Sequence, residues 1–141
     1  MAGYIAQWNA PRVMRGMKES ARAALISEAS RMKAVIQLRI SKPYPPESRP
    51  GRPPHMRTTR LRRSVSVTTS RQSKVLQPTV SINVKAPYSS FLERGTKRMK
   101  KRPFILSTLK MEKSRMRSGI AAAIRAEASR RGILRKRVGS R

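Results

Sequence analysis

The chain has 141 residues, of which 34 are Lys or Arg and six are acidic, so its formal net charge is +28. It contains no Asp and no Cys, which excludes disulfide frameworks and thiolate metal sites. A chain this positive repels itself, so it must meet phosphate groups or the acidic surfaces of partner molecules. Only 38% of the residues are hydrophobic; we therefore expect one small domain whose core is completed by neighbouring subunits.

The residues that usually carry catalysis or bind metals are scarce and scattered. His55 is the single histidine, and with no Asp to orient it, an ordinary loop histidine is favoured over a general base. The Glu residues stand singly near Lys or Arg, which favours surface ion pairs over a metal site. The glycines form no phosphate-cradling pattern. We therefore expect no enzyme activity and no cofactor.

The sequence shows no sign of a targeting or membrane segment. A signal peptide begins with a basic region followed by a continuous apolar stretch, and the first residues of this sequence have neither. No apolar run approaches the roughly 20 residues that span a bilayer. We expect a soluble protein that assembles in a cytoplasm and does not contact membranes.

The first predicted element is a long helix over residues 11–40, in which apolar residues recur at steps of three and four. Asn9 is placed to cap it, and Pro11 suits its first turn. A loop is expected over 41–56, because six prolines interrupt both helical and ladder hydrogen bonds. This proline-rich loop is interpreted either as a mobile linker or as an arm that lies on a neighbouring subunit.

Two strands are predicted next, over Leu61–Thr69 and Val75–Lys85, because Val and Ile alternate there with polar residues. Residues 70–74 are expected to connect them as a hairpin. A short helix is then predicted over Tyr88–Glu93, and Gly95 can supply its stop with a positive φ.

A second long helix is expected to begin at Pro103 and to stop at Gly132, after a basic loop over 96–102. Gly119 is expected to weaken its middle. The apolar stripe predicted for this helix comprises Phe104, Leu106, Leu109, Met116, Ile120, Ala123, Ile124 and Ala128. The order of elements predicts an α+β fold, with one domain over 1–132 and a basic tail over 133–141.

Three clusters of cations are candidates for contact with DNA or with acidic partners. They are Arg57, Arg60, Arg62 and Arg63; Lys97, Arg98, Lys100, Lys101 and Arg102; and Arg130, Arg131, Arg135, Lys136, Arg137 and Arg141. Bound phosphates or acidic neighbours would relieve their mutual repulsion, whereas the alternative is a set of solvated faces. Without an aromatic platform or a helix-turn-helix pattern, any DNA contact is expected to be to the backbone.

Two segments resemble a known family. Arg57–Val65, with the sequence RTTRLRRSV, resembles the Arg-Thr-Gly-x-Leu-x-x-Ser-hydrophobic signature of phage neck and tail-completion proteins, which include head–tail joining proteins similar to the minor tail protein Z of lambda. Tyr88–Ile105, with the sequence YSSFLERGTKRMKKRPFI, resembles the Tyr-x-x-hydrophobic-hydrophobic-Glu-x-Gly-Thr run, basic loop and Arg-Pro-Phe-hydrophobic ending of the same family. Thr59 and Arg94 depart from it. The matching residues are Thr58, Leu61, Ser64, Tyr88, Glu93, Gly95, Thr96, Pro103 and Phe104.

The resemblance, which covers residues 11–131, implies a structural virion protein. Such a subunit would form a hexameric or dodecameric ring that joins the head connector to the tail, next to head-closure and tail-terminator or tail-tube proteins. Genomic double-stranded DNA would pass through the ring. The alternative function is a freestanding nucleic-acid-binding protein without sequence preference.

Individual roles can also be assigned within the second motif. Glu93 is expected either to cap a helix or to pair with the basic loop, and Phe104 to anchor the last helix. Tyr88, Phe91 and Leu92 are expected to pack the short helix on the sheet.

Overall fold

The computed structural model describes residues 10–69 and 79–132. Its elements are, in order, helix α1 (Ala10–Arg39), helix α2 (Arg60–Ser64), strand β1 (Val65–Thr69), strand β2 (Val80–Val84), helix α3 (Ser89–Arg94) and helix α4 (Ile105–Arg130). The predicted α+β fold is confirmed: a long helix, a two-stranded antiparallel sheet, a short helix and a second long helix follow one another along the chain. Asn9, the 70–74 connection, residues 75–78 and the 133–141 tail lie outside the described residues.

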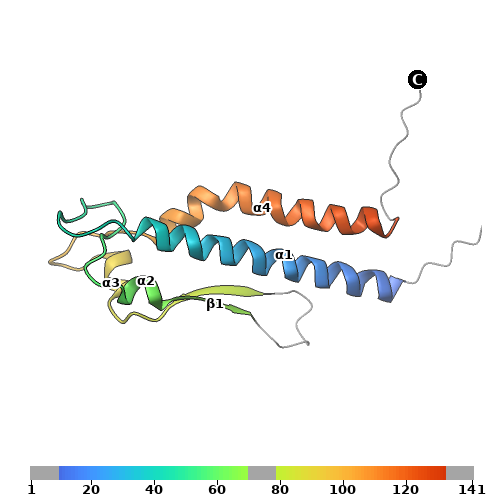
Figure 1. Ribbon diagram of the computed structural model, residues 1–141, viewed down its shortest axis with the longest axis horizontal. Helices are drawn as coiled ribbons and strands as arrows, with labels where there is room; N and C mark the ends of the chain where they lie inside the picture. Colours follow the sequence, from blue (N-terminus) through green and yellow to red (C-terminus); the bar gives the residue numbers. More distant parts are fainter. Residues whose placement is uncertain (1–9, 70–78, 133–141) are drawn as a thin grey trace, which may run out of the picture.

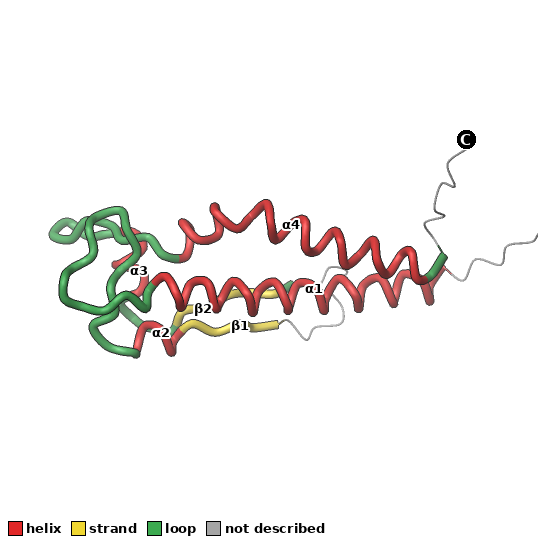
Figure 2. Tube along the Cα trace, turned by 45° about the horizontal axis from the view of Figure 1, so that its top comes forward, coloured by secondary structure: helices red, strands yellow, loops and turns green. Residues whose placement is uncertain are grey.

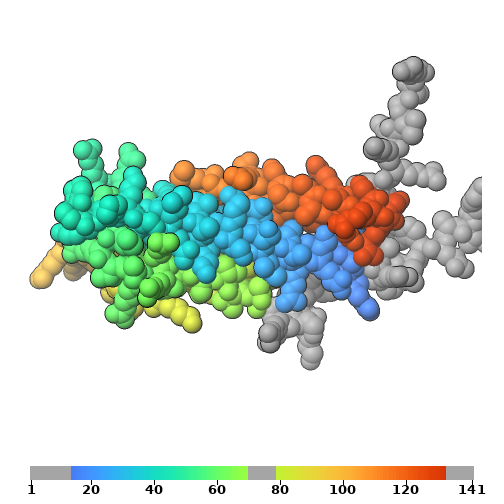
Figure 3. Space-filling model, in the orientation of Figure 1, coloured from blue at the N-terminus to red at the C-terminus, as the bar shows by residue number. Residues whose placement is uncertain are grey.

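Helix α1 is the central element of the molecule. Helix α4 runs antiparallel along one side of it, and the two strands lie on the other side, as Figures 1 and 2 show. The strands form one antiparallel pair, in which Val65 faces Val84 and Thr69 faces Val80. The loops and the two short helices gather at the end where α1 finishes (Figures 1 and 2), and the space-filling view shows the elongated body (Figure 3).

The core lies in the second half of α1. Met32, Ile36 and Ile40 are fully buried; their spacing of four residues places them on one helical face. They form one cluster with four other buried residues, Leu61, Val65, Ala86 and Phe104. Full burial of each large side chain contributes about 1.5–3 kcal/mol, so this cluster fixes the end of α1 to α2, β1 and the start of α4.

A buried polar contact joins α1 and α4. Thr108 is fully buried, and its hydroxyl donates to the carbonyl of Phe104 at 2.6 Å. The Arg39 guanidinium in turn donates to the Thr108 hydroxyl at 2.6 Å. The hydroxyl is therefore satisfied on both sides, as a buried polar group must be.

The prediction of a strand from Leu61 was wrong, because residues 60–64 form the short helix α2. Alternation of apolar and polar residues begins only at Val65; before it, Leu61 is the one apolar side chain, and it is buried. The Ser64 hydroxyl donates to the Leu61 carbonyl at 2.7 Å. A single turn of helix therefore buries Leu61 while its arginines stay exposed.

Three further predictions were wrong in detail. Helix α4 begins at Ile105, two residues after Pro103, and Leu106 is 58% exposed. The buried side of α4 passes through Phe104 and Thr108, and Leu106 is two residues from each, about 200° around the helix. Phe91, expected to pack on the sheet, is 55% exposed.

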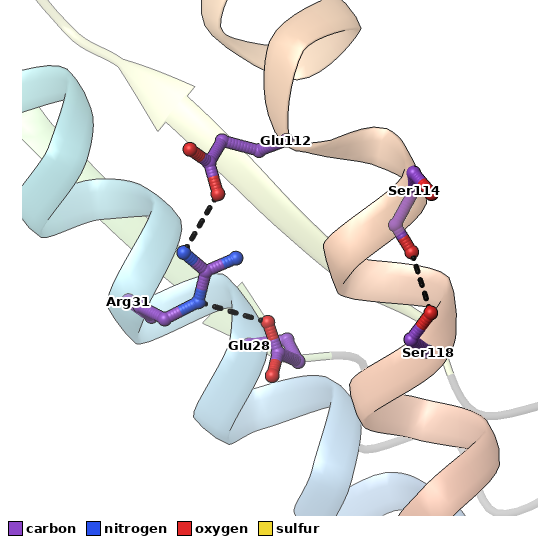
Figure 4. Close-up of polar contacts among 5 residues, drawn as sticks. All are labelled: Glu28, Arg31, Glu112, Ser114 and Ser118. Atoms are coloured by element: carbon purple, nitrogen blue, oxygen red, sulfur yellow. Dashed lines mark hydrogen bonds and ion pairs between the residues drawn. The ribbon is translucent and has the colours of Figure 1, made fainter.

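An ion network crosses between the two long helices. Arg31 of α1 donates to Glu112 of α4 at 2.7 Å and to Glu28 at 3.0 Å (Figure 4). These hydrogen bonds, the one to Glu112 first, raise the pKa of Arg31 above its ordinary value. Gly119 of α4 lies beside this network, since an added Cβ would meet Glu28 Oε1 at 2.5 Å. The glycine that the sequence marks as a weak point thus leaves room for a carboxylate between the helices.

Candidate interaction surface

The segment from α3 to α4 folds back on itself. Gly95 has a φ of +80°, ends α3, and donates its N–H to the Phe91 carbonyl at 2.8 Å. Thr96 closes a tight turn, because its N–H donates to the Met99 carbonyl at 2.8 Å and its hydroxyl accepts from the Met99 N–H at 3.0 Å. The Arg102 N–H then returns to the Leu92 carbonyl at 2.7 Å. The predicted positive-φ stop at Gly95 is confirmed.

Glu93 caps α4 from a distance along the chain. The residue at the N-cap position is Phe104, whose side chain has no acceptor for the free N–H groups of the first turn. Glu93 Oε2 accepts from the N–H groups of Phe104 at 2.9 Å and Ile105 at 3.1 Å, and its Oε1 accepts from that of Leu106 at 2.8 Å. Of the two roles expected for Glu93, the structure shows the cap. The same contacts hold α3 against α4, and Phe104 is the buried anchor that the sequence predicts.

The proline-rich loop lies on its own chain. The Met56 N–H donates to the Lys42 carbonyl at 2.7 Å and closes the base of the loop. At its tip, the Gly51 N–H donates to the Lys101 carbonyl at 2.9 Å. Glu47 forms ion pairs with Arg57 and, at 3.4 Å, with Arg102. The loop therefore joins the two motif segments.

These contacts enclose a pocket of about 840 Å³ between the proline-rich loop, the start of α2, α3 and the 96–102 loop. We call it the basic pocket. Its cations come from two clusters that are far apart in the sequence, and they are Arg57, Arg60, Arg62, Arg98, Lys100 and Arg102. Glu47 is the only carboxylate that lines it among the described residues. The Arg57 guanidinium lies over the Tyr44 ring, 4.5 Å from its centre, a cation–π contact.

The floor of the basic pocket is apolar. Ile40 and Leu61 are buried core residues that also line the pocket, and Tyr88 and Leu92 of the α3 segment pack against the same core. Met99 completes this side. The pocket therefore combines a cationic rim with an apolar floor, a combination suited to a ligand that carries both anionic and apolar groups.

The remaining predicted cations lie outside the basic pocket, and one further motif residue lines it. Thr58 is exposed and lines the basic pocket, whereas Arg63 lines a separate, smaller hollow beside Gln37. Lys97 and Lys101 are exposed outside the pocket. Arg135, Lys136 and Arg137 lie outside the described residues. Sequence reasoning missed the exposed Glu47 and the buried Ser48 as pocket residues, because nothing in a proline-rich stretch indicates which of its polar residues will face another segment.

Across residues 10–69 and 79–132, no three His, Cys, Asp or Glu side chains are grouped as a metal site would need. Within the same ranges no helix has both the length and the apolar character required to cross a bilayer.

No family model matches the chain, and neither a curated protein nor a solved structure matches it. No relative therefore assigns a role to the basic pocket.

Proposed function

We propose that the chain is a structural subunit of a phage neck, which assembles into a ring and joins the head connector to the tail. The observation that carries the proposal is the unit formed by residues 88–105. Its resemblance to the neck-protein signature rests on residues with defined tasks: Glu93 caps α4, Gly95 ends α3, and Phe104 fills the core. A resemblance at residues that hold the fold together supports a shared fold more strongly than a resemblance at exposed positions.

The limited core of the fold supports assembly with neighbours. Within residues 10–69 and 79–132 the sheet has two strands, and a pair of strands leaves backbone groups on its outer edges available for pairing. Large apolar side chains are exposed on three of the helices: Leu38 of α1 by 74%, Phe91 of α3 by 55% and Met111 of α4 by 70%. Neighbouring subunits in a ring would bury such side chains and supply the missing apolar contacts.

The charge of α4 supports a position beside DNA. Lys110, Lys113 and Arg117 are exposed, and their spacing of three and four residues places them on one face of the helix. In a ring around a channel, this face would meet the phosphates of the passing genome. The contact would be independent of base sequence and would weaken as salt is raised.

The test is the presence and copy number of the chain in purified virions. Quantitative mass spectrometry should find it at a constant ratio to the portal protein that fits a sixfold or twelvefold ring, and cryo-microscopy should place it between head and tail. Absence of the chain from virions of the phage that encodes it would refute the proposal.

A freestanding nucleic-acid-binding protein is the rival function, favoured by the same exposed cations of α4. A dedicated binder should hold duplex DNA tightly as an isolated monomer, with a steep salt dependence. It should also be missing from mature particles, so the two functions predict opposite results in the same mass-spectrometric measurement.

A further inference from the structure

The basic pocket contains more positive charge than the chain itself neutralises. Of its six cations, Arg57 and Arg102 pair with Glu47. The side chains of Arg60, Arg62, Arg98 and Lys100 form no ion pair with a carboxylate within the described residues. Like charges that converge on one hollow repel one another, so the pocket favours an anionic occupant.

Two residues that line the pocket also contain buried hydrogen-bonding atoms without partners. Ser48 is only 5% exposed and lines the pocket, and its hydroxyl has no hydrogen-bond partner among the described residues. Arg102 Nε is buried and unpartnered in the same part of the chain. Buried polar groups in folded proteins almost always have a partner. The wall of the pocket therefore contains polar groups that the described residues leave unsatisfied.

The apolar floor favours an acidic polypeptide over nucleic acid as the anionic occupant. A duplex backbone offers phosphates and sugars, which would leave the exposed parts of Tyr88, Leu92 and Met99, the half-buried apolar residues of the floor, without an apolar contact. An acidic polypeptide offers carboxylates together with apolar side chains, so it matches both the rim and the floor.

The printed sequence offers no acidic segment of its own to fill the pocket. Residues 1–9, 70–78 and 133–141 contain no acidic side chain, and Glu47 is already part of the wall. Glu28, Glu93, Glu112 and Glu127 bind groups of their own chain. A second copy would therefore offer only the isolated Glu19.

We propose that the basic pocket binds a short acidic segment of another protein, with an apolar side chain on the floor and carboxylates on the unpaired cations of the rim. The proposal adds a partner class to the proposed neck function and rests on that function only for the source of the partner. In a neck, the segment would belong to an adjoining ring.

The experiment uses the purified full chain and fluorescence anisotropy at about 150 mM salt, where long-range attraction is largely screened. The probe is a labelled synthetic peptide, Glu-Asp-Glu-Leu-Phe-Asp-Glu-Asp. A second peptide carries Gly-Gly in place of Leu-Phe at the same charge, and a third probe is a duplex DNA of random sequence. We expect the first peptide to bind about tenfold more tightly than the second, since burial of one large side chain accounts for such a factor.

Variants with equal charge changes locate the site. Arg60→Gln with Arg98→Gln removes two exposed rim cations, and we expect the peptide affinity to fall about tenfold. Arg62→Gln with Lys100→Gln should have the same effect, so the result does not depend on one variant folding. The matched control is Lys110→Gln with Lys113→Gln on α4, which should change peptide affinity less than about twofold.

The outcomes separate the possibilities. Equal binding of the two peptides, or equal losses in the rim and α4 variants, would show general attraction to polyanions and overturn the proposal. Preference for DNA at the rim would overturn it in favour of nucleic acid. Because these measurements use the isolated chain, their failure leaves the copy number in virions, and so the neck function, to be decided separately.

Discussion

The cap that Glu93 provides for α4 is the contact whose removal we expect to matter most outside the core. In Glu93→Ala, the N–H groups of Phe104, Ile105 and Leu106 lose their common acceptor. Removal of an N-cap usually costs about 1 kcal/mol, and hydrogen bonds to a charged group contribute about 1.5–3 kcal/mol each. Because Glu93 is half-buried and water can replace part of what is lost, we expect a decrease of about 2–3 kcal/mol in the free energy of unfolding.

The charge and the geometry of this cap can be separated. Glu93→Gln keeps one acceptor oxygen but loses the negative charge that favours a helix N-terminus. It also turns an amide N–H toward at least one of the backbone donors. We expect the free energy of unfolding of this variant to fall by about 1 kcal/mol, so that its stability lies between those of the wild-type chain and of Glu93→Ala.

Urea denaturation followed by circular dichroism measures both values, and a thermal scan should show Glu93→Ala melting roughly 5–10 °C lower. Glu19→Ala is the matched control, because Glu19 is an exposed residue of α1 and its removal should change stability by less than about 0.5 kcal/mol. If Glu93→Ala were no less stable than Glu19→Ala, the carboxylate would not be holding α4, and the structural account of the second motif would be refuted.

Three further predictions concern single positions. Gly95 and Gly51 both have a φ of +80°, but only at Gly95 would an added Cβ meet backbone atoms, at 2.9 Å. Gly95→Ala should therefore lower the free energy of unfolding by about 2 kcal/mol or more, and Gly51→Ala by about 1 kcal/mol. Equal losses in urea denaturation would contradict this. Arg31→Gln removes the cation of the ion network between α1 and α4. It should lower the free energy of unfolding by about 1–2 kcal/mol, a value reduced for partial exposure, and by less in high salt. An unchanged midpoint in urea would argue against the network. The hydrogen bond from Arg131, and then the charge of Arg130, lower the pKa of Glu127 below its ordinary value of 4.5. The stabilising effect of the ionised Glu127 carboxylate is therefore present above pH 4.5 and lost as the pH falls below it. Glu127→Gln should lose less stability than the wild-type chain between neutral pH and about pH 3. Parallel losses in the two chains would contradict the assignment.

The basic pocket shows why the site was harder to predict than the elements. Both of its basic clusters were recognised from the sequence, but each was interpreted as a separate surface. Glu47 and Gly51 bring them together, since one pairs with Arg57 and Arg102 and the other binds the backbone of the 96–102 loop. A proline-rich stretch predicts only the absence of helix and strand, and contacts such as these depend on which distant segment it meets.

The sequence alone determined the features that depend on neighbours along the chain. The spacing of apolar residues predicted α1 and α4, because the helical repeat acts over one or two turns, and a glycine followed by a polar turn predicted the end of α3 at Gly95. Only the tertiary structure decided the turn of helix at Leu61, the role of Glu93 and the formation of the basic pocket. In each case the deciding partner is distant in the sequence or belongs to the packed core, and the free energy of such contacts is set by burial and by the meeting of charges in space.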